Sequence, residues 1–295
     1  MVKLRADFVA NWTAQIRHQL TLTWGNEIAN VKDRDIPMYW FESLRRTIAQ
    51  QPRNIRIADD FHCPSKEEPR WKVLQKKVLN GKDLNPHRST AHRSLFNSDG
   101  LLAEWGVHHF HLGINPHPKL SSFVERSGPI VFALVDERTF YAINIYEHTD
   151  RGVFERSRII ESLHRNWPEV ISKYRLRGIA PEKLCEEARR TVRKKGCQAP
   201  VGTADETVYV SIGGLTSPAG IKSESVRDAD IWACQIRSLQ NELQTQLCQL
   251  VPTLEQRGYT GEPEIEAELK ITEDGYQAFF PKYRVRATLL LAEPI

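Results

Sequence analysis

Residues 105–112 read WGVHHFHL, and two further apolar runs follow them, IVFALV at 130–135 and FYAINIY at 140–146. All three runs are short and rich in β-branched and aromatic residues, which is typical of β-strands. The four residues DERT at 136–139 join the second run to the third, so these two runs are predicted to form a hairpin. The centre of the chain is therefore predicted to be a small antiparallel sheet.

The chain before this sheet carries apolar residues at the spacing of a helix, which places their side chains on one helical face. Residues 1–98 are therefore predicted to be a helical N-terminal region, in which Ser65 and Glu68 form a capping box and residues 83–100 are a loop. The three apolar stripes are Phe8, Trp12, Ile16 and Leu20; Phe41, Leu44 and Ile48; and Trp71, Leu74 and Val78.

The chain after the sheet is predicted to return to helices and to end in strands. One helix is expected up to Pro168, and a basic helix from Pro181 to Gly196 closes a central α+β domain at 99–200. In the C-terminal region, 201–295, a long helix begins near Ser223, and alternating residues at 265–271 and after Val285 predict a β-hairpin. The predicted fold class is α+β.

Three of the ten histidines fall within residues 108–111, in the first of the three strands. Because side chains alternate along a strand, His109 and His111 share one face, and Phe110 takes the other. Phe110 is expected to face the core, which leaves the two histidines on an open face. The third strand is read in the same way: Tyr141, Ile143 and Ile145 are expected to face the core, and Asn144, Tyr146 and His148 the open side.

Two chemistries use such a cluster, and a structural role is the third alternative. Imidazoles titrate near neutrality, so His109, His111 and His148 could act as general acid and base in metal-independent RNA cleavage. The same three histidines could instead bind a divalent metal such as zinc or iron. The histidines could also simply hydrogen-bond within the fold.

Basic residues gather in the centre of the chain and acidic residues near its end. The end of the basic helix carries five cations, which could contact a nucleic-acid backbone, although a helix dipole also favours cations there. These residues are Arg189, Arg190, Arg193, Lys194 and Lys195. The acidic stretch 224–274 could face a protein partner. The segment Asn85–Ser89, NPHRS, could contact phosphate or form a solvated turn.

Several classes of protein are disfavoured. The five cysteines are scattered and form no CxxC pair, which argues against a zinc ribbon and for the reducing cytoplasm. No apolar run is long enough to cross a membrane, so no membrane partner is expected. No G-x-S-x-G motif is present, and the cysteines lack a recognisable histidine partner, so serine and cysteine hydrolases are unsupported.

Residues 100–195, with a helical lead-in and a small sheet bearing His, Tyr and basic residues, resemble the barnase/RelE-type endoribonuclease toxins. The resemblance implies metal-independent RNA cleavage, with His109 or His111 as the acid or base. It also implies Tyr146 as a phosphate or base contact, and Arg165 or Arg189 as a transition-state cation. The chain is much longer than a bare toxin domain, which suggests a larger toxin or antiviral-defence effector.

The leading hypothesis is therefore an endoribonuclease-like effector that binds RNA and needs no cofactor. One alternative is a hydrolase that depends on a divalent metal bound by histidines. The other is a non-catalytic component of a complex that binds nucleic acid or protein.

Overall fold

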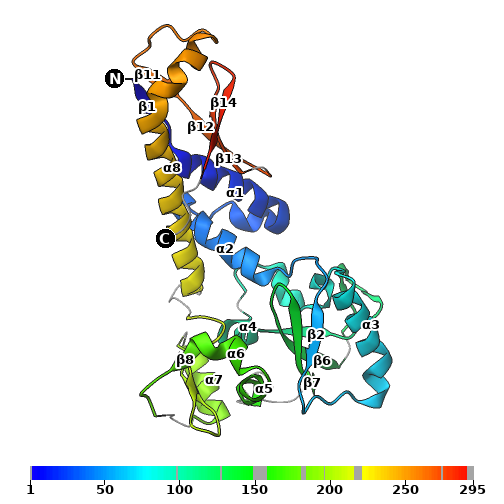
Figure 1. Ribbon diagram of the computed structural model, residues 1–295. Coiled ribbons are helices and arrows are strands. Elements are labelled where there is room, and N and C mark those ends of the chain that lie inside the picture. The colour runs from blue at the N-terminus through cyan, green and yellow to red at the C-terminus, as the bar shows by residue number, and fades with distance from the viewer. Residues whose placement is uncertain are drawn as a thin grey trace. The chain divides into compact units, whose positions relative to one another are not determined.

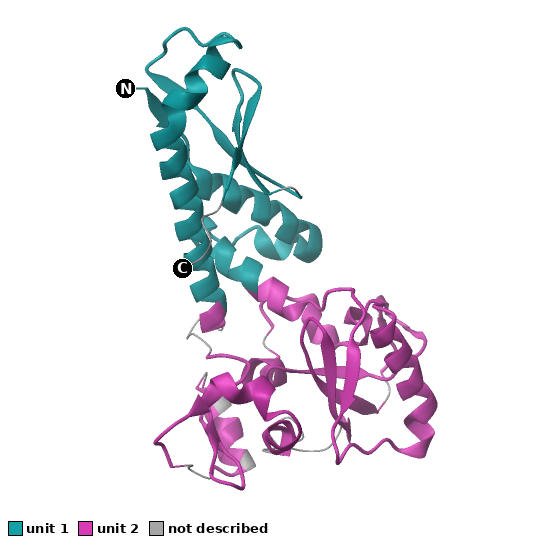
Figure 2. Ribbon diagram, in the orientation of Figure 1, with its two compact units in different colours: residues 1–41, 225–295 teal, residues 42–224 magenta. Residues whose placement is uncertain are grey.

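The computed structural model describes residues 2–97, 99–126, 128–148, 158–180, 184–195, 197–215, 221–273 and 275–290. The fold is α+β, as predicted, with a long helix and then strands in its C-terminal part (Figure 1). The chain forms two compact units, unit 1 from residues 1–41 and 225–295 and unit 2 from residues 42–224 (Figure 2). These boundaries differ from the predicted ones at 98 and 200, because unit 1 joins the two ends of the chain, which local patterns do not reveal.

Unit 1 combines the first helix with the C-terminal helix and strands. The predicted stripe of the first helix is confirmed, since Phe8, Trp12, Ile16 and Leu20 are all buried. Asp7 begins that helix by accepting a hydrogen bond from the backbone N–H of Ala10 at 2.9 Å. The elements of unit 1 are β1 (Lys3–Arg5), α1 (Phe8–Trp24), most of α8 (Ser223–Glu255), β11 (Glu264–Glu266), β12 (Glu268–Thr272), β13 (Gly275–Phe280) and β14 (Val285–Leu289).

The predicted C-terminal hairpin is wrong in its pairing. β12 pairs with β13, and β13 in turn pairs with β14, so the three strands form an antiparallel meander. The middle strand was missed because Gly275–Phe280 lacks a clear alternation of polar and apolar residues. β11 pairs instead with β1, in parallel.

Unit 2 is built around a four-stranded sheet in the order β2-β7-β6-β3. The predicted hairpin of β6 and β7 is confirmed, and β2 adds to β7 in parallel. The chain enters unit 2 within α2 (Ile36–Arg46). The other elements are β2 (Asn54–Ile57), α3 (Glu68–Leu79), α4 (Gly100–Trp105), β3 (Val107–His111), β4 (Pro116–His117), β5 (Leu120–Val124), β6 (Pro129–Val135), β7 (Thr139–Glu147), α5 (Arg158–Asn166), α6 (Pro168–Ile171), β8 (Arg175–Leu176), α7 (Glu186–Lys194), β9 (Val201–Gly202) and β10 (Val208–Tyr209).

Both faces of this sheet are covered, which corrects the expectation of an open face. Trp71, Leu74 and Val78 of α3 pack on one face together with Phe110 of β3. The other face packs against apolar residues of α4, α5 and α6, and residues of β6 that pair with His109 and His111 belong to this second core. All five residues of β3 are therefore buried.

A β-bulge changes the alternation along β7. Phe132 pairs with Asn144, whereas the next residue of β6, Ala133, pairs with Ala142, so Ile143 has no partner in the register. Tyr141 and Ile143 consequently lie in the core of α4–α6, while Ile145 lies in the core of α3. The prediction that all three share one face is wrong for Ile145, because regular alternation cannot anticipate a bulge.

The helices of unit 2 confirm some local predictions and correct others. The predicted stripe of α3 is buried, but the capping box is not formed: Ser65–Glu67 is a 3₁₀ turn and Glu67 precedes α3 without a side-chain cap. Leu44 of α2 is 49 % exposed, because the helix buries Glu42 and Arg46, which form an ion pair at 3.1 Å. Within the described ranges, no helix has the length and hydropathy that a membrane span requires.

Candidate active site on strands β3 and β7

Two local signals fix where β3 begins. Asp99 caps α4, because one of its carboxylate oxygens accepts hydrogen bonds from the backbone N–H groups of Leu101 and Leu102 at 3.0 and 3.1 Å. Gly106 ends the helix with φ +66°, a left-handed conformation that favours glycine. The chain then extends directly into the histidine-rich strand. The short helix was missed because it lies between a polar loop and a strand pattern.

The structure brings together the three histidines that the sequence singled out. The ring centroids of His109 and His111 lie 6.0 Å apart. His148 follows β7, where its backbone N–H donates to the carbonyl of Gly128 at 3.0 Å. The His148 ring lies 6.5 Å from that of His109 and stacks on that of His111 at 5.6 Å. The three rings thus lie close together, while the histidines on β3 are more buried than expected.

A buried carboxylate lies beside this cluster and was not part of the predicted site. Oδ2 of Asp99 is 3.1 Å from Nε2 of His92 and 3.6 Å from Nδ1 of His109. Although burial opposes it, the hydrogen bond with His92 and the proximity of His109 hold the pKa of Asp99 well below its usual range. Burial lowers the pKa of His109, and the charge of Asp99 counters this effect. Asp99 is therefore an anion that orients and polarises two imidazoles.

Arg126 supplies a solvent-facing cation near the same cluster. Its side chain is exposed, and its charge is among the groups that lower the pKa of His109. Its guanidinium donates a hydrogen bond to Oγ1 of Thr90. Nothing in the sequence distinguished Arg126 from other surface arginines, since it lies in the loop between β5 and β6.

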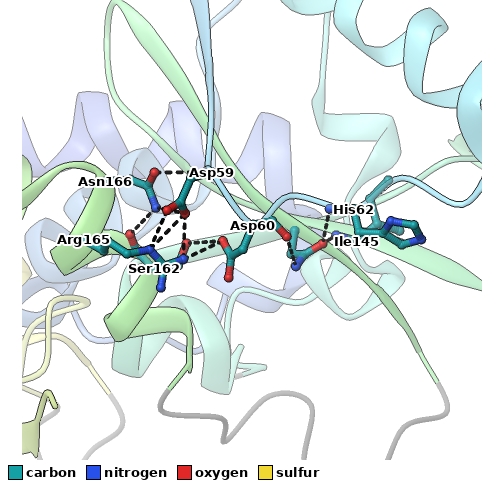
Figure 3. Close-up of polar contacts among 8 residues, drawn as sticks. Asp59, Asp60, His62, Ile145, Ser162, Arg165 and Asn166 are labelled. Atoms are coloured by element: carbon teal, nitrogen blue, oxygen red, sulfur yellow. Dashed lines mark hydrogen bonds and ion pairs between the residues drawn. The ribbon is translucent and has the colours of Figure 1, made fainter.

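Two predicted site residues have different surroundings. Tyr146 is partly buried, and its ring packs at 4.9 Å from that of Phe132 in the core of α4–α6. Arg165 forms a two-pronged hydrogen-bonded ion pair with Asp59 and a second ion pair with Asp60 at 3.0 Å (Figure 3). The described contacts of Arg165 thus connect α5 to the segment after β2, and none of them is with the histidine cluster.

The basic helix is only partly the exposed surface that the sequence predicted. Arg189 is 4 % exposed and pairs with Glu104, which is 2 % exposed, at 3.0 Å. Its guanidinium also lies 5.3 Å from the ring of Trp105 and donates to the carbonyl oxygens of Ala199 and Pro200. The prediction of a nucleic-acid contact is wrong for Arg189, because a helical charge pattern cannot show that α7 turns this residue inward.

Only some of the other basic side chains of this helix belong to the described part of the chain. Lys195 is exposed and Arg190 is half-buried. The side chains of Arg193 and Lys194 lie outside the described part of the chain. Likewise, the first residues of the predicted helix, 181–183, are outside the described residues, and α7 begins at Glu186.

Across the described ranges, no group of three or more His, Cys, Asp or Glu side chains has the arrangement of a metal site. His109, His111 and His148 are therefore neighbours without forming the ligand set that the alternative hypothesis required. The chemistry of these histidines is inferred instead from the contacts between their rings and from the adjacent carboxylate of Asp99.

Comparisons with protein-family models, with curated proteins and with solved structures found no match for this chain. No matching protein therefore assigns a role to Asp99 or to the histidines. Their chemistry follows from position, burial and charge.

Proposed function

We propose that unit 2 is an endoribonuclease that cleaves RNA by acid–base chemistry at His109, His111 and His148. The observation that carries this proposal is the convergence of three imidazole rings within 5.6–6.5 Å of one another, with the Asp99 carboxylate 3.6 Å from one of them. Imidazole can hold or release a proton near neutral pH, so one ring can act as base and another as acid.

The chemistry assigned to the site is attack by the RNA on itself. A neutral His109 accepts the proton of a 2′-hydroxyl, whose oxygen then bonds to the adjacent phosphorus. The bond from phosphorus to the 5′-oxygen breaks, and that oxygen takes a proton from His148 or His111. The products are a 2′,3′-cyclic phosphate and a 5′-hydroxyl. Burial favours the neutral base form of His109, which suits this assignment.

Cations around the site are assigned to the RNA backbone. Arg126 is a candidate for stabilising the charge that develops on the phosphate, because it is exposed and acts electrostatically on His109. The exposed Lys195 and the neighbouring Arg190, Arg193 and Lys194 are proposed to contact RNA more remotely, while Arg189 is assigned to the fold. Tyr146 is retained as a base contact and Arg165 as a remote cation only.

We also propose a biological setting. An RNA-cleaving unit fused to a second unit fits a toxin or antiviral-defence effector of the barnase/RelE kind, with the acidic stretch 224–274 contacting a protein partner. The five cysteines are all free, which is compatible with the reducing cytoplasm.

The test is an RNA-degradation assay with purified full-length protein and His109→Ala, His111→Ala and His148→Ala. Each variant is expected to lose about 10²–10⁴-fold in rate, the usual effect of removing a general acid or base. His62→Ala is the matched control, because His62 is an exposed histidine of the same unit. Cleavage should continue in the presence of a chelator and leave 2′,3′-cyclic phosphate ends.

Other outcomes identify the alternatives. Wild-type protein that binds RNA without cutting it would support a binding component instead. Activity that disappears with chelator and returns with zinc or iron would support the metal-dependent hydrolase. If all four variants cleave RNA at the rate of the wild-type protein, the histidine cluster takes no part in the reaction.

A further inference from the structure

β14 is the outer strand of the three-stranded meander in unit 1. It pairs with β13 on one side, and within the described ranges no strand pairs with its other side. Alternate residues of a strand direct their backbone N–H and C=O groups to opposite edges, so an outer strand presents a row of these groups without a neighbouring strand. The free edge of β14 is therefore a place where another strand can add to the sheet.

Two other strands of unit 1 have their edges covered by amide side chains of the helices. On β12, Gln15 of α1 donates to the carbonyl oxygen of Leu269 at 2.9 Å and accepts from the backbone N–H of Ile271 at 3.1 Å. On β1, Gln244 of α8 accepts from the backbone N–H of Leu4 at 2.7 Å. Among the described residues, no side chain forms such a hydrogen bond with the backbone of β14. The two sides of the meander thus differ, and the side at β14 is the open one.

The open edge also carries apolar side chains that the fold only partly covers. The three half-buried side chains on one face of β14 are Val285, Ala287 and Leu289. Leu290, which follows the strand, is 78 % exposed. The cation of the strand, Arg286, does not lie over the free edge, because its guanidinium carbon is 5.7 Å from the ring centroid of Phe279 on the neighbouring β13. An apolar edge without a charge over it promotes uncontrolled association, and proteins normally cover such an edge.

We propose that the chain forms a homodimer in which β14 pairs antiparallel with β14 of a second copy, about a two-fold axis at Ala287. The two meanders then join into one continuous six-stranded sheet. The interface uses only unit 1, so it goes beyond the cleavage chemistry proposed for unit 2 and does not depend on it.

The sequence of β14 identifies a second copy as the occupant, because the strand complements itself. A two-fold axis brings the same surface of both copies together, so each residue pair across the interface occurs twice. With the axis at Ala287, Val285 of each copy lies opposite Leu289 of the other, and the apolar side chains meet on one face of the sheet. On the other face Arg286 lies opposite Thr288, so no like charges are directly opposed.

The test is sedimentation equilibrium of the full chain over a range of concentrations, with Tm as the measure of folding. Wild-type protein should show a reversible equilibrium between monomer and dimer. Thr288→Lys places a lysine opposite Arg286 twice in each dimer, so the dissociation constant should rise about 2- to 30-fold. Thr288→Glu places a carboxylate there instead and should lower the dissociation constant by a similar factor. Because Thr288 is exposed, Tm of the monomer should change little in either variant.

Two further variants make the outcome specific to this register. Arg286→Glu combined with Thr288→Lys exchanges the charges and should restore the dimer that Thr288→Lys weakens. Thr272→Lys is the matched control, because Thr272 is an exposed threonine on β12, at the other side of the meander, and its replacement should leave the dissociation constant unchanged. If Thr288→Lys fails to fold, the tighter dimer expected of Thr288→Glu still decides the question.

Two results would overturn the proposal. Wild-type protein that stays monomeric at every concentration would leave the β14 edge to a strand of another protein. A wild-type dimer whose dissociation constant is the same in both Thr288 variants would mean that another surface holds the two copies together.

Discussion

Oδ2 of Asp99 lies 3.6 Å from Nδ1 of His109, so one carboxylate both caps helix α4 and contacts the candidate acid–base centre. The cap fixes the position of the carboxylate through two backbone N–H groups, Leu101 and Leu102. Because α4 leads through Gly106 directly into β3, the same short segment positions the anion and the imidazole that it polarises.

Asp99→Asn should separate these two roles. Asparagine caps helices about as well as aspartate, so α4 should keep its start, but the negative charge beside His109 is lost. Since that charge raises the pKa of His109, the acidic limb of the kcat/KM profile for RNA cleavage should move to lower pH. The rate at the optimum should also fall. In the variant, an amide N–H group takes the place of Oδ2 and faces the N–H group of His92 Nε2, so the hydrogen bond between these two residues is lost.

The control for this variant is Asp205→Asn, since Asp205 also contacts a histidine, His164, at 3.1 Å, but away from the cluster. An acidic limb that shifts equally in both variants, or in neither, would count against a role of Asp99 in catalysis.

Arg126→Gln tests whether the exposed cation near His109 contacts the RNA backbone. We expect a lower kcat/KM, and a slope of log affinity against log salt that is flatter by about 0.7, the value for one phosphate contact on a single strand. Arg138→Gln is the matched control, because Arg138 is an exposed arginine in the turn between β6 and β7. Fluorescence anisotropy with labelled RNA at several salt concentrations measures the slope. Equal slopes for Arg126→Gln and wild type would exclude a phosphate contact by Arg126.

Local sequence patterns correctly predicted the elements whose stabilising contacts come from residues close together in the sequence. The stripe of α1 and the hairpin of β6 and β7 are examples, since periodicity and a four-residue turn specify them. The clustering of His109, His111 and His148 followed from the same alternation. Arg189 was misjudged, because its partner Glu104 lies 85 residues away and a charge pattern does not show burial.

The ion pair of Arg189 and Glu104 should stabilise unit 2 without affecting RNA binding. Both side chains are almost fully buried, so Glu104→Leu leaves an unpaired buried arginine and should cost about 3–5 kcal/mol of unfolding free energy. The double variant Arg189→Met with Glu104→Leu should recover most of that loss, because both charges are removed together. Urea denaturation of the two single variants and the double variant measures the coupling. Additive losses would mean that the pair is not coupled in solution.

Because of His87, the stability of unit 2 should decrease at acidic pH. Its Nδ1–H donates to the carbonyl of His111 at 2.8 Å, so Nε2 must accept from the ammonium of Lys77, also at 2.8 Å. Burial, partly offset by the carbonyl contact, lowers the pKa of His87 to about 4 from the usual 6.5. Because of this lowered pKa, His87 of the unfolded chain binds a proton below pH 6.5, whereas His87 of the folded protein does so only below about pH 4. Stability is therefore lost as the pH falls through this interval, by about 3 kcal/mol in total.

His87→Gln removes this titration and keeps an amide that can contact the same carbonyl. Between pH 4 and 6.5, the variant should lose stability less steeply than wild type, by up to about 1.4 kcal/mol per pH unit. Hydrogen exchange of the β3 amides as a function of pH reports unit 2 specifically, because β3 is a buried strand of that unit's sheet. His62→Gln, at an exposed position, should behave like wild type. A slope that is the same in all three proteins would show that His87 takes up a proton as readily folded as unfolded, and that its contact with Lys77 does not persist in solution.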